Sequence, residues 1–156
     1  MASSWTHQGS RVSALATFSI KARVLMKTTH SLRIFDGAAD ISPYDFVLGW
    51  GPLSDTPHMR QLSLLHSTRT AWWSSKPSDL SWEEVVRHAS NLHAIPANYG
   101  VETQLDHVSV DDLVTFSGYL VQVDKPGYLP WTSPLSRTDT GNGACEIMWI
   151  NQVIRH

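Results

Sequence analysis

Two histidines and an asparagine lie close together in the segment HASNLHAIPAN, residues 88–98. Imidazole groups act as general bases, general acids and metal ligands because their ordinary pKa lies near neutral pH. Two ligands of one metal ion are best placed four residues apart on a helix, as in the HExxH motif. His88 and His93 are five residues apart, about 140° around a helix, so the spacing predicts no metal ion shared by them.

The only cysteine of the chain, Cys145, is a second candidate for chemistry, and its being single excludes an intramolecular disulfide. A thiol paired with an imidazole can act as a nucleophile. One hypothesis is therefore a hydrolase with His93 as general base, Cys145 or an activated water as nucleophile, and Asp139 orienting the imidazole. The alternatives are structural: Cys145 as a small buried hydrophobe, and His93 as a residue that closes the last turn of a helix.

The polar segment SPLSRTDTGNG, residues 133–143, contains two short motifs that resemble functional loops. Asp139-Thr140-Gly141 matches the aspartic-protease tripeptide, but the chain has no second copy, so only a homodimer could supply the pair of carboxylates. Gly141-Asn142-Gly143 is followed by neither a lysine nor a helix and is typical of a turn rather than a phosphate-binding loop. No cofactor motif is present, and we expect no cofactor.

Composition limits the class of protein. The chain has 156 residues, 42% of them hydrophobic and 17% charged, which is typical of one globular domain. A net charge of −2 gives no general signal for nucleic-acid binding, and no apolar run is long enough to span a bilayer. We expect a disordered leader or expression remnant over residues 1–14 and a single domain over residues 15–156.

Helix signals occur in two places before residue 100. Ser42-Pro43 with Asp45 resembles a helix start, with Phe46, Val47 and Leu48 as its apolar side. The clearest signal is Ser81-Trp82-Glu83-Glu84, a capping box that predicts the main helix over residues 82–93. On that helix His93 would face the core at the last turn, and Asn91 would flank it.

Strand signals occur over residues 17–28, 62–75, 108–124 and 145–154. The first segment alternates, with Leu25 as the exception, and Gly118 predicts a bulge or bend in the third. The last segment is apolar on both faces and should be a central strand. Together these patterns predict an α+β fold: a curled, mostly antiparallel sheet or a small OB- or SH3-like β-barrel of five or six strands, with one main helix and short helices.

Several long stretches resemble a group of small bacterial proteins to which no activity is attached, many with an N-terminal export or membrane segment. The likeness is carried by residues 22–55, by SNLHAIPA (90–97), by VSVDDLVTFSGYLVQV (108–123) and by WTSPLSRTDTGNGACE (131–146). It implies an extracytoplasmic protein, although no signal peptide is visible in this chain. By this resemblance, the recurring motifs of the group contain Trp50, Asn91, His93, Ser133, Arg137, Asp139, Gly141 and Cys145.

The principal hypothesis is a small binding or interaction domain for an unknown protein or small-molecule ligand. Its site would lie where SNLHAIPA meets loop 133–143, since both segments are polar and constrained by Gly or Pro. Asn91, Ser133, Trp50 and Trp131 would contact the ligand, and Arg137 could clamp a carboxylate or phosphate. Besides the hydrolase, a structural accessory subunit is a third hypothesis, which a broad apolar surface with Trp72 or Trp73 would favour.

Overall fold

The computed structural model describes residues 3–30, 40–55, 60–67, 70–135 and 145–156. The side chains of residues 65–67 and 70–72 also lie outside the description. The helices are the 3-10 helix η1 (Gly51–Ser54), α2 (Trp82–Arg87) and α3 (Tyr99–His107). The strands are β1 (Ser4–His7), β2 (Ser10–Thr29), β3 (Tyr44–Gly49), β4 (Ser63–Ser67), β5 (Thr70–Ser75), β6 (Ala89–Pro96), β7 (Leu113–Asp124), β8 (Trp131–Thr132) and β9 (Cys145–Arg155).

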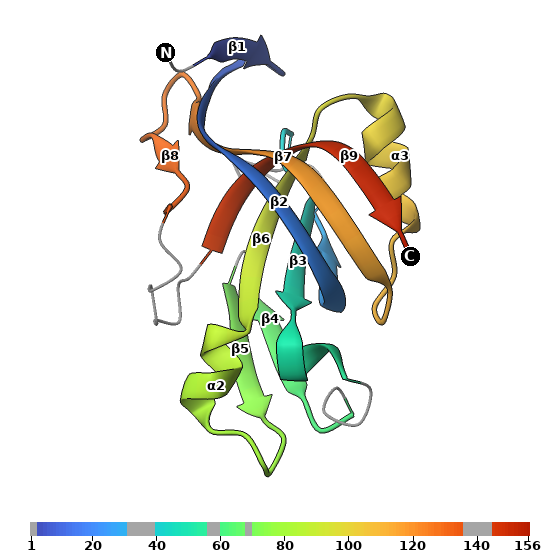
Figure 1. The fold of residues 1–156 in the computed structure, drawn as a ribbon. Helices are drawn as coiled ribbons and strands as arrows, with labels where there is room; N and C mark the ends of the chain where they lie inside the picture. The colour runs from blue at the N-terminus through green and yellow to red at the C-terminus, as the bar shows by residue number, and fades with distance from the viewer. Residues whose placement is uncertain (1–2, 31–39, 56–59, 68–69, 136–144) are drawn as a thin grey trace.

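The main sheet has the strand order β1-β2-β3-β6-β9-β7-β8, and β2 pairs with β7 as well (Figure 1). The pairings therefore form a closed circuit of five strands, β2, β3, β6, β9 and β7, which we call the strand ring. All neighbours in the ring are antiparallel except β6 and β9. The α+β class and the large, mostly antiparallel sheet are confirmed, while β4 and β5 form a separate hairpin.

One long strand, β2, joins both sides of the ring. Residues 11–23 pair with β7, and residues 23–29 pair with β3. The predicted strand and its alternation are confirmed, and the exceptional Leu25 lies where the register with β3 shifts. An extra residue at a register shift bends a strand. Strand β2 needs such a bend because it passes from its partner β7 to its partner β3. The expectation of a disordered leader is wrong for residues 4–7 and 10–14, which lie in β1 and in the start of β2.

The predicted bend at Gly118 is confirmed by the pairing of β7 with β9, whose register shifts between Ser117 and Gly118. A Cβ atom at Gly118 would lie 1.8 Å from the backbone oxygen of Trp149, so no other residue fits without a shift of the strands. The central position predicted for the last strand is also confirmed, because β9 lies between β6 and β7.

The predicted helix over residues 82–93 is right only at its start. Ser81 forms the capping box with Glu84, but α2 ends at Arg87 and residues 89–96 form β6. Strand β6 is buried on both faces, so apolar residues occur at consecutive positions and imitate a helical stripe. His93 consequently lies in the middle of a central strand and not at a helix end.

The helix expected after Ser42-Pro43 is also wrong, because residues 44–49 form the fully buried strand β3. The Ser42 hydroxyl donates to the carbonyl of Ala94 instead of capping a helix. Residues 62–75, predicted as one strand, form the antiparallel hairpin β4–β5. The longest described helix, α3, was not predicted, although Asn98 caps it by accepting from the amide of Val101.

The ring has apolar side chains on both its sides. Inner residues such as Phe46, Leu92 and Phe116 pack with Val101 and Leu105 of α3 into one core. A second core lies on the outer side and includes the buried residues Val12, Ile41, Ile95, Val121, Val123 and Ile147, with Trp5, Tyr119, Trp131 and Trp149 packed against them. Polar groups on the outer side of β3 and β6 therefore lie next to apolar cover and are shielded from water.

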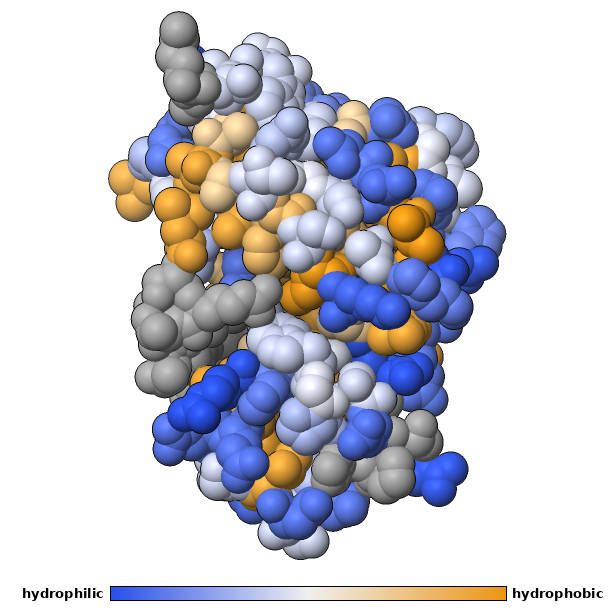
Figure 2. Space-filling view, viewed as in Figure 1, coloured by the Kyte–Doolittle hydropathy of each residue, from blue (hydrophilic) through white to orange (hydrophobic). Residues whose placement is uncertain are grey.

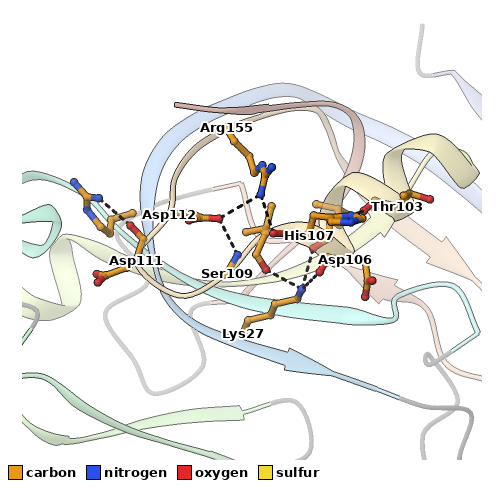
Figure 3. A network of polar contacts seen from close by, with 11 residues as sticks. Lys27, Thr103, Asp106, His107, Ser109, Asp111, Asp112 and Arg155 are labelled. Atoms are coloured by element: carbon orange, nitrogen blue, oxygen red, sulfur yellow. Dashed lines mark hydrogen bonds and ion pairs between the residues drawn. The ribbon is translucent and has the colours of Figure 1, made fainter.

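Lys27 of β2 holds the C-terminal end of α3 (Figure 3). Its Nζ donates to the carbonyls of Leu105, Asp106 and Val108 at 2.8–3.0 Å. A cation at a helix C-terminus satisfies carbonyls that have no partner within the helix. Lys27 also lies over the ring of Tyr44, whose hydroxyl donates to Asp106 at 2.9 Å. These contacts fix α3 against the ring.

Candidate functional site

Asp45 and His93 form the centre of a polar cluster on the outer side of the strand ring. They are directly opposite each other in the pairing of β3 with β6, and their neighbours along the strands, such as Phe46 and Leu92, face the inner core. His93 Nδ1 lies 2.9 Å from Asp45 Oδ1. Asp45 is completely buried and His93 is 4% exposed, so water scarcely screens this contact.

Asp45 has a second imidazole partner. The Nε2 atom of His30, just after β2, lies 2.9 Å from Asp45 Oδ2. A buried carboxylate needs partners of opposite charge or hydrogen-bond donors, and of these two imidazole contacts the one with His93 has hydrogen-bond geometry. The carboxylate is thus held in one orientation, and it fixes the direction of the His93 ring.

Cys145 lies on the far side of His93, at the start of β9 and half buried. It pairs with Asn91 in the register of β6 with β9, and the Asn91 side-chain amide donates to its sulfur at 3.5 Å. Burial by itself would lower the pKa of His93. Hydrogen bonds to Asp45 and Cys145, and their negative charges, outweigh burial and raise this pKa to about 9. The His93 ring is therefore protonated at neutral pH.

The arrangement has the order of a catalytic triad: a carboxylate, an imidazole and a nucleophile. Asp45 engages Nδ1 of His93, and Cys145 is the second side chain that raises the pKa of the same imidazole. A protonated imidazole beside a thiol stabilises the thiolate, which is the reactive form of cysteine. Chemically, the cluster can hold a nucleophilic sulfur and a proton donor side by side.

Strand β8 and the residue that follows it cover part of this cluster. The ring of Trp131 lies 5.2 Å from the His93 ring, centroid to centroid. The Ser133 hydroxyl accepts from the amide of Ile147 at 3.1 Å, and the Ser133 amide donates to Val121 at 3.0 Å. The start of loop 133–143 is thereby attached to β7 and β9, and residues 136–143 lie outside the described residues.

A second buried polar pair lies beside Cys145 on the inner side of the same strands. The hydroxyl of Ser90 donates to a carboxylate oxygen of Glu146, and both residues are 7% exposed. Since successive residues of a strand face opposite sides, Glu146 points away from the face that carries Cys145. The pair therefore belongs to the interior of the ring rather than to the Asp45–His93–Cys145 cluster.

The structure brings together only some of the residues predicted from sequence. Asn91, His93, Cys145, Trp131 and Ser133 lie in or beside the cluster. Trp50 follows the end of β3 and packs against the inner core. The remaining candidates, Arg137, Asp139 and Gly141, lie outside the described residues.

Asp45 is the functional candidate that sequence reasoning missed, because it was assigned to a helix start. The hydrolase hypothesis assigned the role of orienting the imidazole to Asp139. In the structure, Asp45 is the carboxylate that contacts the His93 ring. The available signal was an acidic residue within the apolar run YDFVLG. A charge inside a buried strand is uncommon and indicates a specific partner.

The accessory-subunit hypothesis gains nothing from Trp73, which is half buried and packs against Leu53, Leu80 and Val85. The side chain of Trp72 lies outside the description. Exposed apolar residues occur instead around β8, where Tyr128, Leu129 and Leu135 are 59%, 89% and 61% exposed. Figure 2 shows apolar atoms at the upper left, near β8, on a face that is otherwise mostly hydrophilic.

Across the described ranges, no group of three or more His, Cys, Asp or Glu side chains has the geometry to hold a metal ion. Within the same ranges, no helix has the length and apolar character needed to cross a membrane. Comparison with known proteins found no matching family model, no matching curated protein and no matching solved structure.

Proposed function

We propose that the protein is a thiol hydrolase of the acyl-transfer type, with Cys145 as nucleophile, His93 as acid and base, and Asp45 as the orienting carboxylate. One observation carries the proposal: a buried Asp45–His93 pair, 2.9 Å between Oδ1 and Nδ1, lies in the same cluster as Cys145, which helps to raise the pKa of the His93 imidazole. A carboxylate, imidazole and nucleophile in this order are the groups needed for covalent acyl transfer.

The reaction follows from the protonation states. The Cys145 thiolate attacks the acyl carbon and forms a C–S bond, and the bond to the leaving group breaks as that group takes a proton from His93. Water then attacks the thioester and gives a proton to His93, and the acid leaves as the thiolate returns. Asp45 stabilises the imidazolium and keeps Nδ1 turned away from the sulfur throughout.

Acetylation by 4-nitrophenyl acetate tests this function. We expect a burst of nitrophenolate and an acetyl group on Cys145, seen by peptide mass spectrometry. The His93→Gln variant should lose about 100-fold in acetylation rate, because general acid–base groups contribute about that much. His88→Gln is the matched control, since the His88 ring contacts the Glu84 carbonyl and lies outside the cluster. Acetylation of another residue, or an unchanged rate in His93→Gln, would contradict the proposal.

The second candidate function is ligand binding by an OB-type barrel. The topology favours it: a five-stranded ring with α3 between its third and fourth strands. In OB folds the second and third strands and the adjoining loops bind oligonucleotides or oligosaccharides. Here those strands are β3 and β6, which carry Asp45 and His93. Titration with single-stranded oligonucleotides and with oligosaccharides should then change the fluorescence of Trp131. No saturable change with either class would contradict this candidate.

A further inference from the structure

A cavity of about 210 Å³ lies between the β1–β2 turn, the segment before β3 and the start of α3. Its lining includes His7, Asp40, Pro43, Pro96, Tyr99 and Glu102. Asp45–His93–Cys145 is not part of this lining, so the cavity is separate from the cluster proposed for catalysis. It is smaller than the roughly 300–1,000 Å³ of pockets for drug-sized ligands and suits a single side chain or a small ion.

Two carboxylates face this cavity with hydrogen-bonding capacity left over. Asp40 Oδ2 pairs with Lys125 at 3.2 Å, whereas Asp40 Oδ1 is buried and accepts no hydrogen bond within the described part of the chain. Glu102 has no side-chain hydrogen bond or ion pair to any described residue. A buried carboxylate oxygen without a donor is costly, so a ligand that donates there would remove that cost.

The nearby imidazole does not neutralise these acids. Burial lowers the pKa of His7, and the charges of Asp40 and Glu102 oppose that shift without reversing it. His7 is therefore neutral at pH 7, and its ring packs edge-on against Trp149 with centroids 4.7 Å apart. Lys125 offsets one of the two negative charges. The cavity as a whole keeps about one unit of negative charge.

Flat groups form part of the wall, beside Gln8, Ile41 and Asn98. Tyr99, the first residue of α3, is 83% exposed, and two prolines, Pro43 and Pro96, lie in the same lining. Aromatic faces attract cations, and a guanidinium also stacks on flat surfaces. Carboxylates and an aromatic ring around a small cavity together favour a planar cation.

We propose that this cavity binds a guanidinium group, with Asp40 and Glu102 accepting its hydrogen bonds and Tyr99 stacking on its face. The group could belong to a free small molecule or to an arginine side chain of a peptide. The planar, forked guanidinium fits two carboxylates better than an ammonium does, because its donors point in fixed directions. This proposal does not depend on the chemistry of Cys145.

NMR titration of the full chain tests the proposal with three probes. Ethylguanidinium represents the free source, the blocked tripeptide Gly-Arg-Gly represents the peptide source, and ethylurea is the neutral control of the same shape. We expect saturable shifts of the His7 and Tyr99 ring signals with a guanidinium probe and none with ethylurea. The tripeptide binding at least about tenfold more tightly than ethylguanidinium would assign the site to a peptide. Tighter or equal binding of ethylguanidinium would assign it to a free molecule.

Glu102→Gln is the decisive variant, because the Glu102 side chain has no hydrogen bond or ion pair to a described residue whose loss would disturb the fold. It should weaken binding about tenfold, since a hydrogen bond between charged partners is lost. Asp40→Asn should do the same, and His107→Gln, on the far end of α3, should leave binding unchanged. Shifts that stay linear with concentration, equal shifts with ethylurea, or undiminished binding by Glu102→Gln would each overturn the proposal.

Discussion

Two polar networks lie against the strand ring, and they differ in what faces the charge. The Lys27 ammonium meets the backbone carbonyls of Leu105, Asp106 and Val108, whose charge cannot change with pH. Asp45 instead meets side chains that gain or lose protons, His30 and His93, and Cys145 lies beyond them. The first network can only hold a helix in place. The second can move a proton, and this difference separates a structural ion contact from a candidate site.

The largest effect on stability is expected from Asp45→Asn. The change leaves the buried His93 and the half-buried His30 without their carboxylate and should lower the free energy of unfolding by about 3 kcal/mol. Urea denaturation measures the loss. Asp124→Asn, on a carboxylate that accepts from Gln122 and from no other described side chain, should change stability by less than about 0.5 kcal/mol. A loss no larger than that of the control would show that Asp45 is not the centre of the network.

The dependence of stability on pH should separate the two networks. The folded pKa of His93 is raised from 6.5 to about 9, so its stabilising effect is complete below pH 6.5 and is lost as pH rises through 9. Asp45 from β3, His30 from the segment after β2 and Cys145 from β9 face this ring. The wild type should therefore lose about 3 kcal/mol relative to His93→Gln between pH 6.5 and 9. Parallel curves for the two proteins would exclude the raised pKa.

Lys27→Met should act on the other network alone. Loss of the donor leaves three carbonyls at the end of α3 without their cation and should cost about 2 kcal/mol. Burial lowers the pKa of Lys27, and the charges of Asp106 and Asp112 oppose that shift. The three partners of Lys27 are backbone carbonyls, which do not titrate, so the loss should be the same at pH 6.5 and pH 8. Faster amide exchange confined to α3 would locate the effect, and an equal rise in β6 would contradict the separation.

The smallest effect is expected from Tyr44→Phe, which removes the hydroxyl that donates to Asp106 and keeps the ring beneath Lys27. The cost should be about 1 kcal/mol, the net value of one hydrogen bond. Thermal unfolding of this variant beside Lys27→Met measures how the helix contact divides between the ammonium and the hydroxyl. A loss greater than that of Lys27→Met would contradict the central role of Lys27.

Local chemistry was predictable from the sequence, and long-range pairing was not. The capping box of Ser81 and Glu84 joins residues three apart, and Gly118 marks a bend whatever its neighbours are. Asp45 meets His93 across 48 positions, and this contact follows only once β3 and β6 are known to pair. The helix predicted over residues 82–93 was too long because its second half belongs to β6. A strand that is buried on both faces lacks the alternation of apolar and polar residues by which a strand is recognised.

The rate at which iodoacetamide alkylates Cys145 at pH 7 tests the central claim most directly. If His93, held by Asp45, promotes the reactive thiolate, the wild type should react faster than both His93→Gln and Asp45→Asn. Equal rates in the wild type and the two variants would contradict the account.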